Sequence, residues 1–243
     1  MKCAAIIPAR FGSTRFPGKP LALIKGKPMI QWVYENTAAC GLVGKTVVAT
    51  DSEEIRNAVC GFGGEAVMTS PDHETGTDRI AEAAENIDAE LIINVQGDEP
   101  VLPAAAIEEA VLPLVNDSTI PMGTLKTKIL KKEEISDTNI VKVITDINNF
   151  ALYFSRSVLP FDRGGNNEID FYRHIGLYVY RKDFLFKVSK MEQTLLEKAE
   201  KLEQLRVLEN GYSIMVKETD YYPVGVDVPD DILKVEKLMN GGN

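Results

Sequence analysis

The chain has 243 residues, 44% of them hydrophobic and 26% charged, and its formal net charge is −9. This length and composition are typical of a globular protein that buries a sizeable core. The acidic balance argues against nucleic acid and anionic membrane surfaces as partners, and no apolar run reaches the ~18 residues of a membrane span. Three scattered cysteines without zinc or redox spacing, and a start that lacks a signal-peptide pattern, favour the reducing cytoplasm.

The first predicted element is a buried strand over residues 4–7, which we expect Pro8 to end. The loop that follows is rich in turn-forming residues and contains three cations, Arg10, Arg15 and Lys19. Because no acidic residue precedes Glu35, these cations and the free backbone N–H groups of the loop should converge on a small polyanion such as a phosphate. The alternative is a solvated basic loop.

Short strands and amphipathic helices then alternate as far as residue 114. Strands are expected over residues 46–50, 66–68 and 91–95, and helices over 29–40, 51–62, 77–86 and around 107–114. Asp51, with Glu54 three residues later, is predicted to start the second helix as part of a capping box. This alternation is typical of a parallel sheet covered by helices.

Beyond Met122 the predicted strands lengthen, and some of them are expected to be antiparallel. A hairpin is predicted from residues 140–145 and 150–154, and further strands are predicted over 176–180 and 214–217. A charge-rich stretch over 192–210 predicts one helix with Leu195 on its apolar side, and a last helix should bury Val235. We expect two lobes on one continuous sheet rather than two separable domains.

Asp98 follows the buried strand at 91–95. Ligands of open α/β sheets bind at the carboxyl ends of the strands, so a carboxylate there, close to the basic loop, suits a nucleotide with Mg²⁺. The cations would hold phosphate oxygens and the carboxylate would hold the metal. Asp98 could instead be a simple turn residue. Asp227 could complete the site, or it could be an acid at the start of the last helix.

A second group of polar residues follows the strands of the second half. Arg156 comes after one predicted strand, and His174 precedes another, with Tyr178 four residues later. These are candidate groups for a second, acidic substrate, although a lone histidine is more often structural. Glu203 and Gln204 could be surface polar residues. The sequence contains no Walker A motif, no G-x-G-x-x-G after a strand and no G-x-S-x-G, which argues against P-loop NTPases, Rossmann dehydrogenases and α/β-hydrolases.

Eight segments resemble, in order, the 3-deoxy-manno-octulosonate cytidylyltransferase family: I-I-P-A-R-F-G-S-T-R-F-P-G-K-P-L, V-A-T-D, T-G-T-D-R, N-V-Q-G-D-E-P, A-L-Y-F-S-R, H-I-G-L-Y, L-E-Q-L-R-V-L-E-N-G and G-V-D-V-P-D-D. The resemblance implies an α/β nucleotidyltransferase fold with a mostly parallel central sheet, flanking helices and a smaller antiparallel lobe. It also implies a cytoplasmic, Mg²⁺-dependent homodimer. That enzyme transfers CMP from CTP to 3-deoxy-D-manno-octulosonate and releases pyrophosphate, for lipopolysaccharide biosynthesis.

By position in these motifs, the resemblance implies roles for individual residues. The nucleotide would be bound by Arg10, Ser13, Arg15, Lys19, Thr75, Gly76 and Arg79. Mg²⁺ would be bound by Asp98 and Asp227, which with Arg15 and Lys19 form the catalytic set. The sugar acid would be surrounded by Gln96, Arg156, Arg163, His174, Tyr178, Glu203 and Gln204. Within one domain over residues 1–243, residues 1–120 would mainly bind CTP, 121–225 would mainly bind sugar and form the dimer, and 226–243 would form a returning C-terminal helix.

The sequence departs from the family pattern at two places. Val228 stands where the family usually has Thr, and Thr194-Leu195 replaces a usual Ser-Pro. Neither change removes an implied ligand. Glu99 fits the main branch of the family better than the branch that uses an 8-amino analogue of the sugar. The alternatives are a cytidylyltransferase for that analogue or for a sialic-acid-like sugar, and a catalytically silent nucleotide-binding protein.

Overall fold

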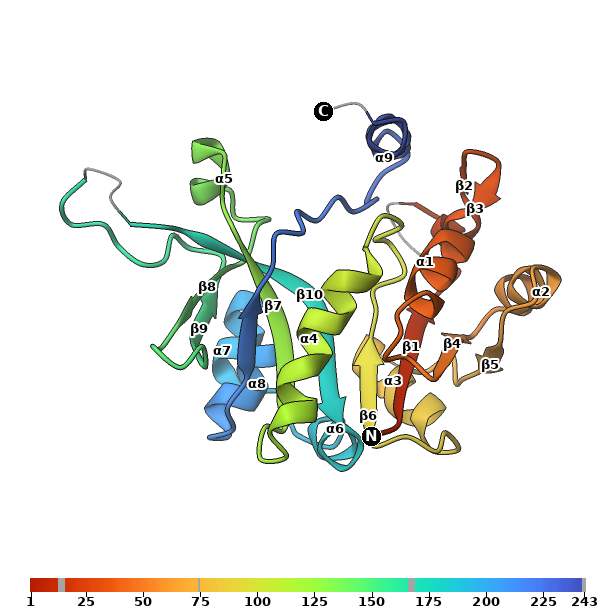
Figure 1. Ribbon diagram of the computed structural model, residues 1–243, viewed down its shortest axis with the longest axis horizontal. Helices are drawn as coiled ribbons and strands as arrows, with labels where there is room; N and C mark the ends of the chain where they lie inside the picture. The colour runs from red at the N-terminus through yellow and green to blue at the C-terminus, as the bar shows by residue number, and fades with distance from the viewer. Residues whose placement is uncertain (13–15, 74, 166–168, 242–243) are drawn as a thin grey trace. The chain divides into compact units, whose positions relative to one another are not determined.

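The computed structural model describes residues 1–12, 16–73, 75–165 and 169–241 (Figure 1). The chain divides into two compact units. The first unit comprises Met1–Glu108 and Tyr222–Asn243, and the second comprises Glu109–Tyr221. Among the described residues, no helix is long and apolar enough to cross a membrane.

A parallel sheet forms the centre of the first unit, in the order β6-β1-β4-β5. Its strands are β1 (Cys3–Ala9), β4 (Lys45–Thr50), β5 (Ala66–Met68) and β6 (Leu91–Asn94). The strands β1, β4 and β6 are almost entirely buried, as expected for a parallel sheet covered on both faces. Figure 1 shows β1 with its neighbours and α1 beside it. The predicted parallel α/β arrangement is confirmed.

The first unit contains four α-helices besides the start of α4 among its described residues. They are α1 (Met29–Ala38), α2 (Glu53–Gly61), α3 (Gly76–Ala84) and α9 (Asp231–Met239). A 3₁₀ turn η1 (Lys19–Leu21) and a small hairpin of β2 (Leu23–Ile24) and β3 (Lys27–Pro28) precede α1. The boundary between the two units falls inside α4 (Ala104–Asn116).

Pro8 does not end the first strand, so that prediction was wrong. Strand β1 continues to Ala9, and Pro8 pairs with Ala49 of β4. On the other side, the ladder with β6 ends at Ile6. The carbonyl oxygen of Pro8 faces Gly97 on that side, where an added Cβ would lie only 3.0 Å from it. The backbone N and O atoms of one strand residue point to the same side of the strand. The N atom of Pro8 therefore points away from β4, to the side on which the ladder has ended, and the missing N–H breaks no ladder hydrogen bond.

The start of α2 also differs from the prediction. The N-cap is Ser52, whose hydroxyl accepts a hydrogen bond from the backbone N–H of Ile55. Asp51, predicted as the capping acid, forms an ion pair with the fully buried Arg79 instead. Asp51 and Ser52 are both residue types that can cap a helix. The carboxylate of Asp51 is the stronger acceptor and pairs with the buried guanidinium of Arg79, and Ser52 caps the helix.

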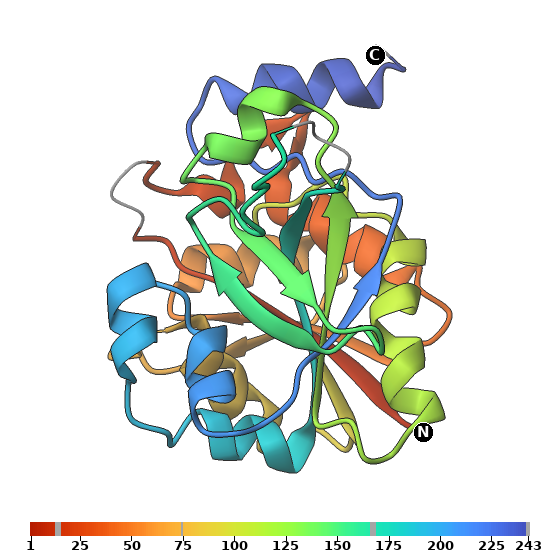
Figure 2. The ribbon, with the colours of Figure 1, turned by 90° about the vertical axis from the view of Figure 1, so that its left-hand side faces the viewer.

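The second unit has a mainly antiparallel sheet. Strand β7 (Met122–Lys128) pairs antiparallel with β10 (Tyr172–Arg181) and parallel with β11 (Met215–Glu218). Strands β8 (Lys142–Thr145) and β9 (Ala151–Ser155) form the predicted hairpin, which is seen among the green ribbons of Figure 2. The short helices α5 (Lys132–Ser136) and α6 (Lys182–Val188) flank these strands in sequence.

The single helix predicted over 192–210 is two short helices, α7 (Leu195–Glu200) and α8 (Gln204–Glu209). Lys201 between them has a φ of 56°, in the left-handed region that ends α7. Leu195 is 78% exposed rather than packed on an apolar side. The reason is a buried ion pair: the guanidinium of Arg206 on α8 donates to both carboxylate oxygens of Glu197 on α7. This pair needs the two helices to fold side by side.

Candidate active site

Three distant segments of the first unit meet at the side chain of Lys19. Its ammonium lies 2.7 Å from Oδ2 of Asp98 and 3.7 Å from Oδ1 of Asp227. It also donates a hydrogen bond of 2.9 Å to the carbonyl oxygen of Val226. The Lys19 side chain is 17% exposed, so this charge cluster is partly shielded from water. The structure therefore brings together one cation and both of the acids that the sequence singled out.

The backbone fixes the two acid-bearing segments against each other. The N–H of Val226 donates to the carbonyl oxygen of Asp98 at 3.0 Å. The Val226 side chain is fully buried in an apolar cluster with Ile24, Met29 and Val235 of α9. Because the cluster holds Val226, the neighbouring Asp227 is held near Lys19 before any ligand binds. Such preorganisation reduces the entropic cost of assembling the site when a ligand binds.

Asp231, rather than Asp227, is the acidic residue at the start of the last helix. Helix α9 begins at Asp231, and its Oδ2 accepts hydrogen bonds from the backbone N–H groups of Asp227 and Val228, at 3.0 and 3.1 Å. The side chain of Lys234 donates to the same carboxylate, which lowers the pKa of Asp231, and the two N–H groups lower it further. The turn before α9 thus has its own acidic acceptor, and the carboxylate of Asp227 is oriented towards Lys19.

The donor set fits a hard divalent cation bound together with phosphate. Asp98 and Asp227 already approach one positive centre, the ammonium of Lys19. Among the described residues, no group of three or more His, Cys, Asp or Glu side chains could hold a metal. The protein would therefore supply two carboxylates, and water and substrate phosphate would supply the remaining oxygens. Mg²⁺ is usually bound in this manner, through one or two carboxylates.

The other residues predicted to contact the nucleotide lie in several places. Ser13 and Arg15 lie outside the described residues. Arg10 is exposed directly after β1, in a loop that closes through a hydrogen bond between Gly18 and Phe11. Thr75 and Gly76 form the start of α3, where Thr75 and Asp78 make a capping box. The roles of these residues with a nucleotide stay predictions.

Arg79 is fully buried and is held by protein groups. Its guanidinium lies 2.7 Å from Oδ2 of Asp51, which follows β4, and it donates to the hydroxyl of Thr69, which follows β5. Arg79 therefore ties α3 to the loops at the carboxyl ends of two strands. Its predicted closeness to the nucleotide stays a prediction, and its visible contribution is to hold these loops.

In the second unit, the rings of Phe154 and Tyr178 contact the ring of His174. The ring centroids of His174 and Tyr178 are 5.4 Å apart, and Phe154 of β9 meets His174 edge-on at 5.0 Å. Burial, with a smaller effect of the adjacent Arg173 charge, lowers the pKa of His174 to about 3. Burial also raises the pKa of Tyr178, and the charge of Glu203 adds to that shift. Both groups are therefore neutral near pH 7.

The remaining candidates for the sugar acid are arranged as follows. Arg156 follows β9, and Glu200 holds it: the Nε of Arg156 donates to the Glu200 carbonyl at 2.8 Å, and its backbone N–H donates to the carboxylate at 3.0 Å. Arg163 is exposed in the loop after β9. Gln204 is buried at the start of α8, next to Glu203. Gln96 follows β6 in the first unit, and its Nε2 donates a hydrogen bond of 3.4 Å to Oδ1 of Asn94.

Sequence reasoning missed Glu200, which also accepts a hydrogen bond from the Ser155 hydroxyl at 2.6 Å. No motif marks this glutamate, because its role depends on a contact between residues 44 or more positions apart. It also missed Thr124, which contacts His174 from β7. A buried threonine in a strand gives no sequence signal beyond ordinary strand propensity.

Comparison with known proteins identifies the class. A family model described as cytidylyltransferase matches residues 4–217. The chain therefore belongs to the cytidylyltransferase family and is a nucleotidyltransferase. The same fold, at 15% identity and a TM-score of 0.66, occurs in a cytidylyltransferase from Leptospira borgpetersenii serovar Hardjo-bovis (strain JB197), matched over 100% of this chain and 88% of that one.

Closer relatives define the branch. Proteins of Geotalea uraniireducens (strain Rf4) and Geobacter sulfurreducens (strain ATCC 51573 / DSM 12127 / PCA), both named 3-deoxy-manno-octulosonate cytidylyltransferase, are each 56% identical to this chain. The matches cover 97% and 98% of this chain and 98% and 100% of the relatives. A solved structure of CMP:2-keto-3-deoxy-manno-octonic acid synthetase complexed with CTP matches with a TM-score of 0.95 and 40% identity, over 99% of both chains. Within the cytidylyltransferases, this chain belongs to the 3-deoxy-manno-octulosonate cytidylyltransferase family.

Proposed function

We propose that the protein transfers CMP from CTP to 3-deoxy-D-manno-octulosonate, giving the CMP-sugar and pyrophosphate, for lipopolysaccharide biosynthesis. The observation that carries the proposal is the meeting of Lys19, Asp98 and Asp227 in a chain whose relatives bear the name of this activity. A phosphate-binding cation beside two carboxylates is what a nucleotide with its metal requires.

The reaction is an in-line displacement at phosphorus. The anomeric hydroxyl of the sugar acid attacks the α-phosphorus of CTP, the bond to the β-phosphate oxygen breaks, and pyrophosphate leaves. The protein mainly has to align the groups and to balance the developing negative charge. In this proposal Lys19 and Arg10 would balance charge on the phosphates. Mg²⁺ held by Asp98 and Asp227 would supply further neutralisation of phosphate oxygens.

The candidates for the sugar acid supply complementary chemistry. Arg156 offers a cation for the carboxylate of the sugar acid. Neutral Tyr178 offers a phenolic O–H, which burial keeps protonated because it raises the pKa of that group. Neutral His174 offers a ring nitrogen that can form a hydrogen bond with a hydroxyl group of the sugar.

The assembly and location belong to the proposal as well. We expect a cytoplasmic homodimer with the small molecules CTP and sugar acid as its ligands. Support comes from the family resemblance and from free cysteines, of which Cys3 and Cys40 are buried. Light scattering on the 26.8 kDa chain tests the dimer directly, because a solution mass equal to one chain would contradict it.

Pyrophosphate release from CTP tests the function. The substrates to compare are 3-deoxy-D-manno-octulosonate, its 8-amino analogue and a sialic acid. Release that is fastest with the first sugar supports the proposal, whereas preference for another sugar identifies one of the alternative cytidylyltransferases. A folded protein that binds CTP and releases no pyrophosphate with any of the three would be the silent nucleotide-binding protein.

A further inference from the structure

Strand β10 contains a β-bulge beside His174. Ile175 of β10 pairs with Leu125 of β7, and Tyr178 pairs with the adjacent Thr124, so the register shifts by two residues at this point. A bulge interrupts the ladder and leaves backbone groups that need other partners. In this sheet the groups are the carbonyl oxygens of Ile175 and Leu177, and both are buried residues.

The bulge also brings the two rings together. His174 lies opposite Lys126, and Tyr178 lies opposite Thr124. Four residues of β10 thus span the length of two residues of β7, about 7 Å instead of about 13 Å. This shorter distance brings the rings of His174 and Tyr178 into contact.

The hydroxyl of Thr124 is placed in the bulge. Its Oγ1 lies 2.8 Å from the carbonyl oxygen of Leu177 and 3.0 Å from that of Ile175. The same oxygen lies 3.0 Å from Nε2 of His174. Thr124 is 1% exposed, so water does not compete for these contacts.

The single proton of this hydroxyl determines the state of the histidine. Carbonyl oxygens only accept hydrogen bonds, so the Thr124 proton is directed to Leu177 or Ile175. If it were directed to His174 instead, two buried carbonyl oxygens would face an oxygen with no proton between them, which is costly. The contact with the ring is therefore a hydrogen bond donated by Nε2–H of His174 to the threonine oxygen.

We propose that Thr124 is a positioning residue that holds neutral His174 with its proton on Nε2, so that Nδ1 accepts a hydrogen bond from a hydroxyl group of the sugar acid. The identity of this ligand rests on the proposed function, whereas the tautomer does not. Among the described residues, Nδ1 has no hydrogen-bond partner, and His174 is only half-buried. An acceptor that the protein leaves open suits a hydroxyl donor and does not suit a carboxylate.

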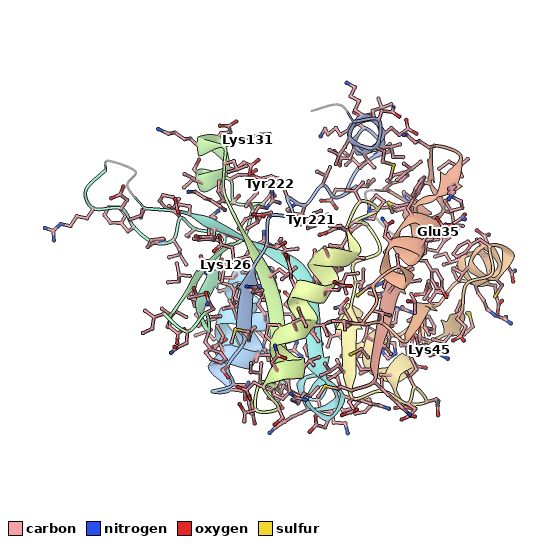
Figure 3. All side chains as sticks on the ribbon, in the orientation of Figure 1. Glu35, Lys45, Lys126, Lys131, Tyr221 and Tyr222 are labelled. Atoms are coloured by element: carbon pink, nitrogen blue, oxygen red, sulfur yellow. The ribbon has the colours of Figure 1, made fainter. Side chains whose placement is uncertain are left out.

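The charged neighbours agree with a neutral ring. Lys126, labelled in Figure 3, lies opposite His174, and its ammonium donates to the Thr145 hydroxyl at 2.8 Å and lies 4.5 Å from the Tyr172 ring centroid. Arg173 is adjacent in sequence, and the low pKa of His174 reflects burial and this charge. The carboxylate of Glu203 acts on Tyr178, and the carboxylate of Glu218 acts on Lys126 and Tyr172.

Nitrogen NMR of the imidazole rings tests the tautomer without any substrate. The chain has two histidines, so ¹⁵N-histidine labelling gives two ring systems, and the His73→Gln variant assigns them. We expect the His174 ring to show a protonated Nε2 and a bare Nδ1 between pH 6 and 8. A ring protonated on Nδ1, or on both nitrogens, in the wild-type protein would overturn the proposal.

Two substitutions separate the hydroxyl from the shape of the side chain. Thr124→Val keeps the branched shape and removes the hydroxyl, and we expect the His174 ring to become a mixture of tautomers. Thr124→Ser keeps the hydroxyl and should retain the wild-type spectrum. Thermal melts show whether each variant is folded. If Thr124→Val proves unstable, the serine variant and the wild-type spectrum still decide, because loss of the Nε2–H tautomer in a folded Thr124→Ser protein contradicts the assignment.

Kinetics test the connection to the sugar. For Thr124→Val we expect a rise in KM for the sugar acid of about 3- to 10-fold, the size of one neutral hydrogen bond, with KM for CTP unchanged. An equal rise in both KM values would indicate general damage and overturn the positioning role. A wild-type protein without turnover would instead refute the proposed function, and in that case the NMR result would still decide the tautomer.

Discussion

The ammonium of Lys19 lies 2.7 Å from the carboxylate of Asp98, although 79 residues separate them in the chain. The second acid, Asp227, is 3.7 Å from the same ammonium. In the ligand-free protein the lysine therefore balances part of the charge of two carboxylates. A bound phosphate would compete with these carboxylates for the ammonium, which makes Lys19 the residue whose loss affects the site most directly.

We expect Lys19→Ala to reduce kcat/KM by about 10²–10³, because the developing charge on the phosphates loses an electrostatic donor. Lys45→Ala is a matched control, since Lys45 is an exposed lysine paired with Glu65 and is labelled in Figure 3. The control should change stability by about 0.5 kcal/mol or less and leave the rate unchanged. Near-normal activity of Lys19→Ala would show that Lys19 does not stabilise the charge that develops on the phosphates.

Asp227→Asn should raise the Mg²⁺ concentration needed for half-maximal rate and lower kcat, because an amide lacks the charge that offsets dehydration of the metal. The control is Asp230→Asn, the same substitution three residues later at an exposed position. A magnesium titration of activity, with thermal melts, compares the two variants. If both variants behave like the wild type, Asp98 remains as the one assigned ligand.

The neutral state of His174 predicts a specific pH dependence of stability. An unfolded histidine binds a proton below about pH 6.5, whereas in the folded protein burial lowers the pKa of His174 to about 3. Between these values the unfolded state binds one more proton, so the free energy of unfolding contributed by this residue falls as pH falls. The expected slope is about 1.4 kcal/mol per pH unit.

Denaturant unfolding between pH 4 and 8 gives the free energy of unfolding of the wild-type protein and of His174→Gln. The difference between the two values isolates the contribution of His174, because the carboxylates common to both proteins contribute equally. The difference should be constant above about pH 7 and should change with pH below about pH 6. A difference that is constant over the whole range would mean that the histidine charges equally in the folded and unfolded states.

Glu197→Gln should lower the free energy of unfolding by about 3–5 kcal/mol, because the buried guanidinium of Arg206 loses the carboxylate to which it donates two hydrogen bonds and keeps the more distant Glu203, at 3.8 Å. The side chains of Glu197 and Arg206 are 7% and 4% exposed, respectively. The matched control is Glu53→Gln, which removes the exposed pair with Arg56 and should cost less than about 0.5 kcal/mol. Chemical denaturation measures both. Equal small effects would mean that α7 and α8 do not depend on this pair.

The family resemblance predicts a strong preference for CTP over ATP and GTP, with UTP as a weak substrate. A pocket that reads a pyrimidine edge mainly through backbone groups fits one ring size, and uracil differs from cytosine only in its polar edge. Values of kcat/KM for the four nucleotides test this expectation. Comparable use of ATP would contradict it.

Sequence patterns predicted the strands and helices well where the apolar residues form a continuous run or recur at a regular spacing. Residues 46–50 are a continuous apolar or β-branched run, and residues 91–95 are apolar except for Asn94; they form the central strands β4 and β6. The meeting of Lys19 and Asp98 followed from the rule that parallel strands place their following loops at one edge of the sheet. These features depend on local pattern plus one general topological rule.

The errors occurred where a long-range contact overrode the local signal. Pro8 remains in β1 because the ladder on its other side has already ended. The helix over 192–210 breaks at Lys201, which is neither Gly nor Pro, and the break serves the buried pair of Arg206 and Glu197. The bulge opposite Thr124 has only Gly176 as a marker in sequence, and this glycine does not indicate which side chain contacts the bulge. Such features are determined by partners that a single local window does not contain.

The bulge in β10 has a consequence for how the sequences of relatives vary. Gly176 and Leu177 are two extra residues that the Thr124 hydroxyl makes tolerable, since it serves the carbonyl oxygens that the interrupted ladder leaves behind. A relative that deletes these two residues loses the need for a hydroxyl at this position. In a relative that keeps them, we expect threonine or serine at this position. The insertion and the hydroxyl should therefore be gained and lost together, as one inherited unit.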